Sequence, residues 1–411
     1  MAALRDEILI ERMGREGDGL ARITGAVVPV PGALPGERVR LDPLEIVKAS
    51  SDRVEPPCRH FQRCGNCVVQ HWRLERSREW KREIVRGAFR REGIEVEPEE
   101  TFGSEPGTRR RVTFTATRDG ERVRLGYHER RSDDVVAVEE CPVALPRIVE
   151  ALPSLERAAE LAMRGGLQVH VVASEAGLDV ALRRGAALPD DQRRALVAHA
   201  VASGWARVSL DGEVLAESEA PTVPFGNVKA FVPVDGFLQA TQPSEDAMAA
   251  LVLAHLAKSK RIADLFCGAG TFALRLAHGR SVTAFESDAA ALETLARSAA
   301  KAERSVGTRV RDLAERPVPA KELDAFDGLV LDPPRAGAGA QAVQIARSRV
   351  ERVAYVSCHP ATLARDAKVL TDGGYALERV VPIDQFVWSA HVEAVALFAK
   401  PKRKRERRLF G

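Results

Sequence analysis

The sequence predicts an α/β protein of three parts: a small N-terminal β-barrel, a central α+β domain with a mostly antiparallel sheet, and a C-terminal doubly wound sheet. Three patterns support this prediction. Short strand-like segments separated by turn residues fill the first fifty positions, alternating apolar and polar residues dominate positions 109–217, and strands alternate with helices after position 237. A chain of 411 residues is also too long for a single core.

The N-terminal part has short strand candidates at residues 7–11, 25–31 and 37–41, with a glycine-rich turn at 14–19 and a Pro-Gly turn at 35–36. Short strands with regular turn punctuation are typical of a small barrel, which we place at residues 1–52. A charged stretch at 74–92 has apolar residues at helical spacing and predicts a helix.

The central part, residues 53–235, has strand candidates at 112–116, 123–127, 135–138, 169–172 and 178–182. These segments alternate apolar and polar residues, as strands of an antiparallel sheet do when one face is buried. One helical stretch, near 148–164, interrupts them.

The C-terminal part, residues 236–400, has strand candidates at 261–266, 281–286, 328–332 and 353–358 and helix candidates at 271–278, 288–303 and 362–370. This alternation predicts right-handed crossovers and a doubly wound sheet. A basic tail follows at 401–411, and the run 400–408 alone holds seven basic residues against one acid.

Charge and hydropathy indicate a cytoplasmic protein with no membrane partner. No apolar run approaches the roughly 20 residues that a membrane span needs. The N-terminus carries acids where a signal peptide would have its apolar core. Net charge is only +3, but arginines cluster at 109–111 and 130–131 and in the tail. One such run is typical of a solvated surface, whereas together they fit a phosphate-backbone partner.

A glycine turn at residues 262–273 joins a strand to a helix and predicts a ligand site. Gly268 and Gly270 permit a tight turn close to a ligand, and Glu286 ends the next strand, where its carboxylate can accept from two ribose hydroxyls. Asp264 inside the strand and the Asp332-Pro-Pro turn favour S-adenosylmethionine over a dinucleotide. Asp312 could meet the adenine edge, although an ordinary surface acid fits the same pattern.

Cys358 follows a strand directly and precedes a helix that begins near Pro360. Side chains at the carboxyl ends of parallel strands face the ligand site of such sheets. A helix N-terminus stabilises a thiolate, so we expect a lowered pKa and a nucleophile here, although most free cysteines are small buried apolar residues. We expect Cys267 to pack behind the cofactor and His391 to be a strand-end hydrogen bonder.

Four further cysteines, Cys58, Cys64, Cys67 and Cys141, bridge two segments and include one closely spaced pair. Such a set suits zinc or an iron-sulfur cluster, and the spacing alone does not choose between them. Scattered free thiols are the plain alternative.

Several of these motifs together resemble the RNA uracil-5 methyltransferase family. The resemblance rests on DLFCGAGTF at 264–272, LDPPR at 331–335, VSCHPATLARD at 356–366 and HVE at 391–393. Upstream, VDGFLQAT at 234–241 is similar to a cofactor-binding segment, and RRRV at 109–112 and residues 125–142 are similar to the central RNA-binding domain. Residues 1–52 resemble a TRAM barrel, so nearly the whole chain is covered.

The resemblance implies a Rossmann-like class I S-adenosylmethionine-dependent methyltransferase that forms 5-methyluridine in RNA. Cys358 would attack uracil C6, and Glu393 would remove the C5 proton. The cofactor site would be lined by Gln239, Phe266, Thr271, Glu286, Asp312 and Asp332, and a 4Fe-4S cluster would be held by Cys58, Cys64, Cys67 and Cys141. The family usually has asparagine where this chain has Thr241, Thr271 and His359.

The same resemblance favours 23S ribosomal RNA as substrate, with uridine 54 of transfer RNA as the alternative. We expect the protein to act as a monomer. Reaching C6 requires an unstacked base, so we expect a single-stranded or loop substrate. Two hypotheses of other classes stay open: an iron-sulfur redox or radical enzyme acting on RNA, and a catalytically silent RNA-binding module. A radical enzyme needs three cysteines and an open iron, whereas a fourth cysteine here would close the cluster.

Overall fold

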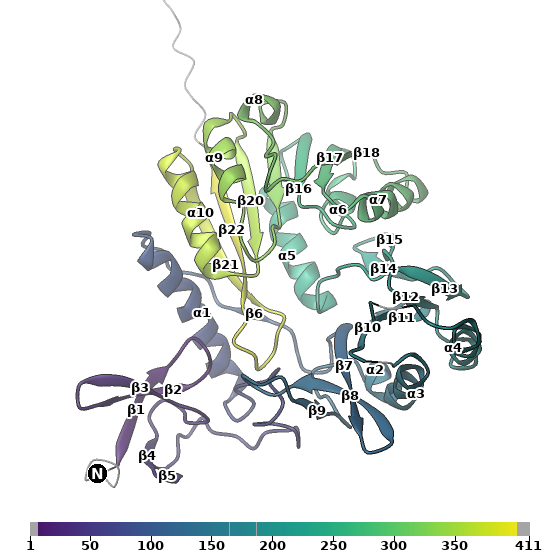
Figure 1. Cartoon of the computed structure of the whole chain (residues 1–411). Coiled ribbons are helices and arrows are strands. Elements are labelled where there is room, and N and C mark those ends of the chain that lie inside the picture. Colours follow the sequence, from purple (N-terminus) through teal and green to yellow (C-terminus); the bar gives the residue numbers. More distant parts are fainter. Residues whose placement is uncertain (1–6, 164, 186, 401–411) are drawn as a thin grey trace, which may run out of the picture.

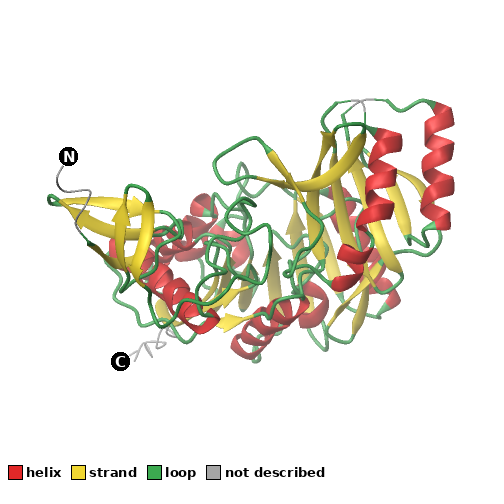
Figure 2. Ribbon diagram, turned by 90° about the horizontal axis from the view of Figure 1, so that it is seen from below, coloured by secondary structure: helices red, strands yellow, loops and turns green. Residues whose placement is uncertain are grey.

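The structure is a computed structural model that describes residues 7–163, 165–185 and 187–400. The predicted basic tail at 401–411 therefore lies outside the described residues. Three sheets make up most of the molecule, with the N-terminal sheet at one end and the central sheet at the other (Figure 2). No helix in the described ranges is long and apolar enough to cross a membrane.

The N-terminal strands form one small five-stranded antiparallel sheet in the order β3-β2-β1-β4-β5. The strands are β1 (Ile8–Met13), β2 (Gly19–Ile23), β3 (Ala26–Val30), β4 (Arg38–Leu41) and β5 (Leu44–Lys48). A few buried side chains around Ile10 and Val39 fill its core. The buried Glu37 carboxylate accepts from Arg53 at 2.6 Å, which fixes this sheet to the segment that leads into the cysteines.

The central sheet has seven strands in the order β13-β12-β11-β10-β7-β8-β9, and only the β11–β12 pair is parallel. This confirms the mostly antiparallel prediction. The strands are β7 (Arg111–Asp119), β8 (Arg122–His128), β9 (Val135–Ala137), β10 (Gln168–Ser174), β11 (Gly177–Arg183), β12 (Arg207–Leu210) and β13 (Glu213–Glu217). The helix predicted near 148–164 is two helices, α2 (Pro146–Glu150) and α3 (Leu152–Ala162), because the chain restarts with a proline in the first turn of α3. A third helix, α4 (Asp190–Ala202), was not predicted.

The C-terminal sheet has eight strands in the order β18-β17-β16-β19-β20-β22-β21-β6 (Figure 1). Its strands are β16 (Arg261–Leu265), β17 (Ser281–Glu286), β18 (Val306–Val310), β19 (Gly328–Leu331), β20 (Arg352–Ser357), β21 (Ala376–Asp384) and β22 (Glu393–Ala399). Its helices are α5 (Gln242–His255), α6 (Ala273–Leu276), α7 (Ala289–Lys301), α8 (Ala320–Leu323), α9 (Gly339–Arg347) and α10 (Pro360–Asp372). Two large apolar clusters bury the two faces of this sheet, as a doubly wound fold requires.

Two elements from early in the chain complete the C-terminal sheet. Helix α1 (Leu74–Arg91) packs beside α10 and β21, and β6 (Phe102–Gly103) adds the edge strand parallel to β21 (Figure 1). The buried Lys81 ammonium of α1 donates to the equally buried Asp384 carboxylate at 2.5 Å. A short hairpin, β14 (Thr222–Phe225) and β15 (Val228–Phe231), then leads from the central sheet into α5.

Candidate active site

The thiol of Cys358 and the carboxylate of Glu393 lie on neighbouring strands of the C-terminal sheet. In the antiparallel pair β20–β22, Ser357 lies opposite Ala394. If this register is continued by one residue, Cys358, which follows β20, lies beside Glu393, the first residue of β22. The thiol is half-buried and the carboxylate is 3% exposed. The two residues predicted to react, one a thiol and one a carboxylic acid, thus lie at one edge of the sheet.

Cys358 opens onto a cleft of about 470 Å³ with basic walls. Arg109 at the start of the central domain, the pair Arg130 and Arg131 after β8, and Arg335 after the Asp-Pro-Pro turn all line it. The cleft therefore combines a thiol with four guanidinium groups, of which Arg130 and Arg131 are paired with Asp18. Glu16 also lines it, and the remaining positive charge is suited to a polyanionic substrate.

The predicted lowering of the Cys358 pKa is wrong for the chain without ligands. The pKa of this thiol is raised to about 11, first by burial and then by the negative charges of Glu393 and Asp332. Helix α10 does begin at Pro360, as predicted, but its N-terminus does not outweigh two neighbouring carboxylates and the loss of water. The thiol therefore rests protonated.

Burial raises the pKa of Glu393 to about 7, whereas a hydrogen bond from Gln385 and the charge of Arg111 act in the opposite direction. A carboxyl group with a pKa near neutrality can both take up and release a proton at physiological pH, as a general base must. The Arg111 guanidinium also lies over the ring of Phe237, 4.7 Å from its centroid.

A chain of side-chain amides joins Glu393 to Asp332 across the sheet edge. The Gln385 amide group donates to Glu393 at 2.7 Å and to the side-chain Oε1 of Gln239 at 2.8 Å, and the Gln239 amide group donates to Asp332 at 3.0 Å. Gln385 itself accepts from the backbone N–H of Ala240 at 2.8 Å. The predicted base and two predicted cofactor-binding residues therefore belong to one hydrogen-bonded network.

The glycine turn lies where the expected cofactor would approach. Phe266 has a positive φ of 59°, and the N–H of Gly268 donates to Glu286 at 3.0 Å, which links the ends of β16 and β17. A Cβ added at Gly268 would meet nothing within 4 Å, so the turn faces open space. Asp264 is fully buried, its carboxylate has no side-chain partner among the described residues, and burial raises its pKa to about 8 against the effect of the Ala273 backbone N–H.

The other two predicted cofactor-binding residues lie at the same sheet edge. Thr271 follows the glycine turn, and its carbonyl oxygen accepts from Arg275 at 2.9 Å. Asp312 follows β18, and one carboxylate oxygen accepts from the N–H groups of Ala314 and Glu315. Cys267 is buried, as expected for a side chain behind the turn.

The four cysteines Cys58, Cys64, Cys67 and Cys141 line one small cavity between the N-terminal linker and the central domain. The thiols are near enough for the charge of Cys141 to raise the pKa values of the other three, after the larger effect of burial. None of the four is in a disulfide. Within the described ranges, no group of three or more His, Cys, Asp or Glu side chains is placed to hold a metal ion.

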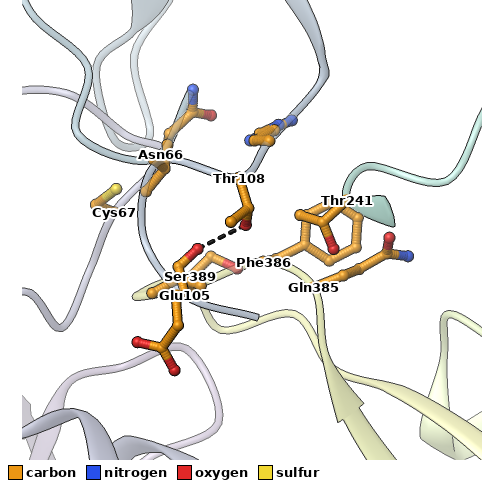
Figure 3. Close-up of a pocket in the computed structure, with 11 residues that line it drawn as sticks. Asn66, Cys67, Glu105, Thr108, Thr241, Gln385, Phe386 and Ser389 are labelled. Carbon is orange, nitrogen blue, oxygen red and sulfur yellow. Dashed lines mark hydrogen bonds between the residues drawn. The ribbon is translucent and has the colours of Figure 1, made fainter. Parts of the chain in front are cut away.

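Figure 3 shows a second small cavity that brings the cysteine segment beside the loop that connects β21 to β22. Asn66 and Cys67 line it from one side and Gln385, Phe386 and Ser389 from the other. Backbone hydrogen bonds join the same segments, because the N–H groups of residues 68 and 69 both donate to the carbonyl oxygen of residue 388.

Sequence reasoning missed Gln385 and Phe386. Both follow a strand that ends at Asp384, and polar or aromatic residues just past a strand end are the signal that could have identified them. The structure shows in addition that His391 lines the cleft and that its ring contacts Phe386 edge-on, with 5.9 Å between centroids.

Comparisons with known proteins agree with this geometry. The family described as tRNA (Uracil-5-)-methyltransferase matches residues 232–401, and the TRAM domain matches residues 6–41. An uncharacterized RNA methyltransferase of Brucella suis is 45% identical, over 97% of this chain and 98% of its own length. The 23S rRNA (uracil(1939)-C(5))-methyltransferase RlmD of Halomonas elongata is 36% identical, over 98% of this chain and 91% of its own length.

Among solved structures, the tRNA (uracil-54, C5)-methyltransferase of Pyrococcus abyssi, determined with S-adenosyl-L-homocysteine, superposes with a TM-score of 0.75. It shares 23% identity and covers 96% of this chain and 100% of its own, so it establishes the fold. From the extent and identity of the sequence matches, the chain belongs to the S-adenosylmethionine-dependent RNA uracil-5 methyltransferase family.

Proposed function

We propose that this enzyme methylates C5 of a uridine in 23S ribosomal RNA, with Cys358 as nucleophile and Glu393 as base. The observation that carries the proposal is the placement of this thiol beside this carboxylate at the sheet edge where the glycine turn lies. The similarity to RlmD of Halomonas elongata supports the ribosomal target. Transfer RNA, the substrate in the name of the Pyrococcus abyssi protein, is the alternative.

The reaction needs a nucleophile because C5 of uracil does not attack an alkyl donor by itself. The Cys358 thiolate adds to C6, and the electrons of the C5–C6 double bond move toward C5 and the C4 carbonyl. Bound S-adenosylmethionine supplies an electrophilic methyl group on a sulfonium sulfur. Once C5 carries the methyl group, Glu393 takes the C5 proton, the double bond re-forms, and the S–C6 bond breaks to release the thiolate.

We propose that Gln239, Phe266, Thr271, Glu286, Asp312 and Asp332 hold the cofactor. Five of them lie at or after the carboxyl ends of adjacent strands, and Gln239 is joined to that edge by its hydrogen bond to Asp332. This supports the proposal, since ligands of open α/β sheets bind at that edge. The buried Asp264 carboxylate, which has no side-chain partner among the described residues, adds a polar group directly behind the turn. Such a group is expected to meet a ligand or an ordered water.

We also propose that the four cysteines hold a 4Fe-4S cluster. The four thiols come from two chain segments and line one cavity, which supports the cluster. A cluster holds its four sulfur ligands farther apart than a single metal ion does. The cluster would join the linker at residues 58–67 to the central domain at Cys141 and so stabilise both. Purified protein should then be brown and carry about four irons per chain, and Cys58→Ser should lose them. Colourless protein with one zinc would overturn the assignment.

We place the division of the chain near residues 52 and 235, which gives a TRAM-like part at 1–52, a central part at 53–235 and a catalytic part at 236–400. The three separate sheets support this, with residues 74–103 reaching across to the catalytic sheet.

The proposal includes a cytoplasmic monomer. Six free cysteines support a reducing compartment, and a complete pair of reacting groups within one chain supports a monomer.

Transfer of a labelled methyl group to total RNA tests the proposal, with the modified base mapped afterwards. Wild type should transfer, Cys358→Ala should not, and Glu393→Gln should accumulate a covalent RNA adduct because the C5 proton stays in place. The cofactor product should be S-adenosylhomocysteine. An active Cys358→Ala enzyme would overturn the mechanism, and a deoxyadenosyl product would support radical chemistry instead.

A further inference from the structure

A groove of about 600 Å³ runs between strand β1 and helix α1, apart from the reaction cleft. In Figure 1, α1 lies between the N-terminal sheet and the catalytic domain. The floor of the groove is apolar and nearly closed, because Met13, Trp72, Trp80 and Ile84 are each 6–8% exposed. The walls are charged, with five arginines and three glutamates.

The unpaired charge of this groove is entirely positive. Each glutamate already has an arginine partner: Glu11 pairs with Arg22, Glu79 with Arg76, and Glu83 with Arg86. Arg12, Arg15, Arg90 and Arg91 line the groove and are exposed, and their side chains have no hydrogen bond or ion pair in the part of the chain that the structure describes. Four free guanidinium groups on the rim of one groove make it a site for a polyanion.

The groove leads to the reacting thiol. Arg15 lies in the turn after β1. The pKa of His359 is lowered by burial, then by the charge of Arg335 and then by that of Arg15, so Arg15 is close to His359. His359 is the neighbour of Cys358, and Glu16 lines the reaction cleft with that thiol. The groove and the cleft therefore adjoin at the turn between β1 and β2.

We propose that this groove, the β1–α1 groove, binds the sugar–phosphate backbone of the RNA substrate beyond the reacting uridine. The inference rests on the proposed function, because it needs an RNA whose uridine occupies the cleft. From Arg76 to Arg91 the helix rises about 22 Å, at 1.5 Å per residue, which accommodates a few nucleotides of one strand. The contacts are to phosphates and carry no sequence preference.

The test is the salt dependence of RNA binding by the double variant Arg90→Gln/Arg91→Gln. The matched control is Arg194→Gln/Arg347→Gln, which removes the same charge from exposed and unpaired helical arginines of α4 and α9, outside the lining of the groove and the cleft. Dissociation constants are measured by fluorescence anisotropy over a potassium chloride series, with an RNA fragment that wild type methylates.

Losing two phosphate contacts should reduce the slope of log K against log salt by about 1.5 in the groove variant and leave it unchanged in the control. The KM for RNA should rise, while kcat at saturating RNA and the affinity for S-adenosylhomocysteine should stay at wild-type values. Equal slopes in the two double variants, or a groove variant with the wild-type slope, would overturn the proposal. Wild type that transfers no methyl group to RNA would instead refute the proposed function, and the two failures are distinguishable.

Discussion

Replacing Gln385 with leucine tests whether the amide network controls the protonation of Glu393. In the wild type the hydrogen bond from Gln385 lowers the Glu393 pKa against burial, leaving it at about 7. Hydrogen bonds to charged groups contribute about 1.5–3 kcal/mol, and about 1.4 kcal/mol corresponds to one pH unit. The Gln385→Leu pKa should therefore rise by about one to two pH units, so the ionised fraction at pH 7 falls from about a half to about a tenth or less.

In the proposed mechanism Glu393 acts after the thiolate has attacked, so the defect should appear at the elimination step. We expect a covalent RNA adduct on denaturing gels near pH 7, with turnover recovering at about pH 8.5 to 9 as the carboxyl group ionises. Glu393→Gln should retain its adduct at every pH. Gln344→Leu is the matched control, since Gln344 accepts a comparable hydrogen bond from Ala320 far from the cleft. A Gln385→Leu enzyme with no adduct and the wild-type pH profile would refute this reasoning.

Other perturbations follow from buried charges. Asp264→Asn should raise the melting temperature, and by more as pH rises. The folded protein raises the Asp264 pKa to about 8, so the stability that the protonated carboxyl group contributes is full below its unfolded pKa of 3.8 and is lost as pH rises through 8. Melting curves recorded over a pH series measure this difference. Glu393→Gln should speed alkylation of Cys358 by iodoacetamide, read by peptide mass spectrometry, because it removes a charge that raises the thiol pKa; an unchanged rate would contradict this. Lys81→Met should lower the free energy of unfolding by about 3–5 kcal/mol, measured by chemical denaturation, because it leaves the Asp384 carboxylate buried without its cation. Adding Asp384→Leu should restore most of that free energy.

The parts of this site that the sequence predicts are those encoded by local patterns. The strand, glycine turn and following helix around Gly268 are contiguous, and Cys358 stands next to an apolar strand in the sequence itself. Once those strands are placed in one parallel sheet, their carboxyl ends must share an edge, so Glu286 and Asp332 follow with no further information. The parallel pairing of β16 with both β17 and β19 confirms that these residues are neighbours at one edge.

The parts that escaped prediction depend on contacts between distant segments. Strand β6 and helix α1 precede the central domain yet complete the catalytic sheet, and no periodicity in residues 74–103 indicates which sheet they join. Gln385 is one polar residue in a loop until the fold brings it within hydrogen-bonding distance of Gln239 and Glu393. The Cys358 pKa was wrongly predicted for the same reason, since a helix N-terminus is visible in the sequence, whereas burial of the thiol and the two carboxylates that face it are not.

The raised pKa values at this edge have a common electrostatic origin. Asp264, Asp332 and Glu393 are acids placed near one another, and the negative charge of Glu393 raises the pKa of both Asp332 and Cys358 after burial has done so. Acids that are buried together, away from water, favour the binding of a positively charged ligand. A sulfonium ion carries such a charge. By linkage, a bound cation stabilises the anionic forms of the acids around it, including the thiolate of Cys358. In the proposed mechanism, the protonated resting thiol of Cys358 would become a nucleophile only when the methyl donor is in place, which would limit its alkylation by other electrophiles in the meantime.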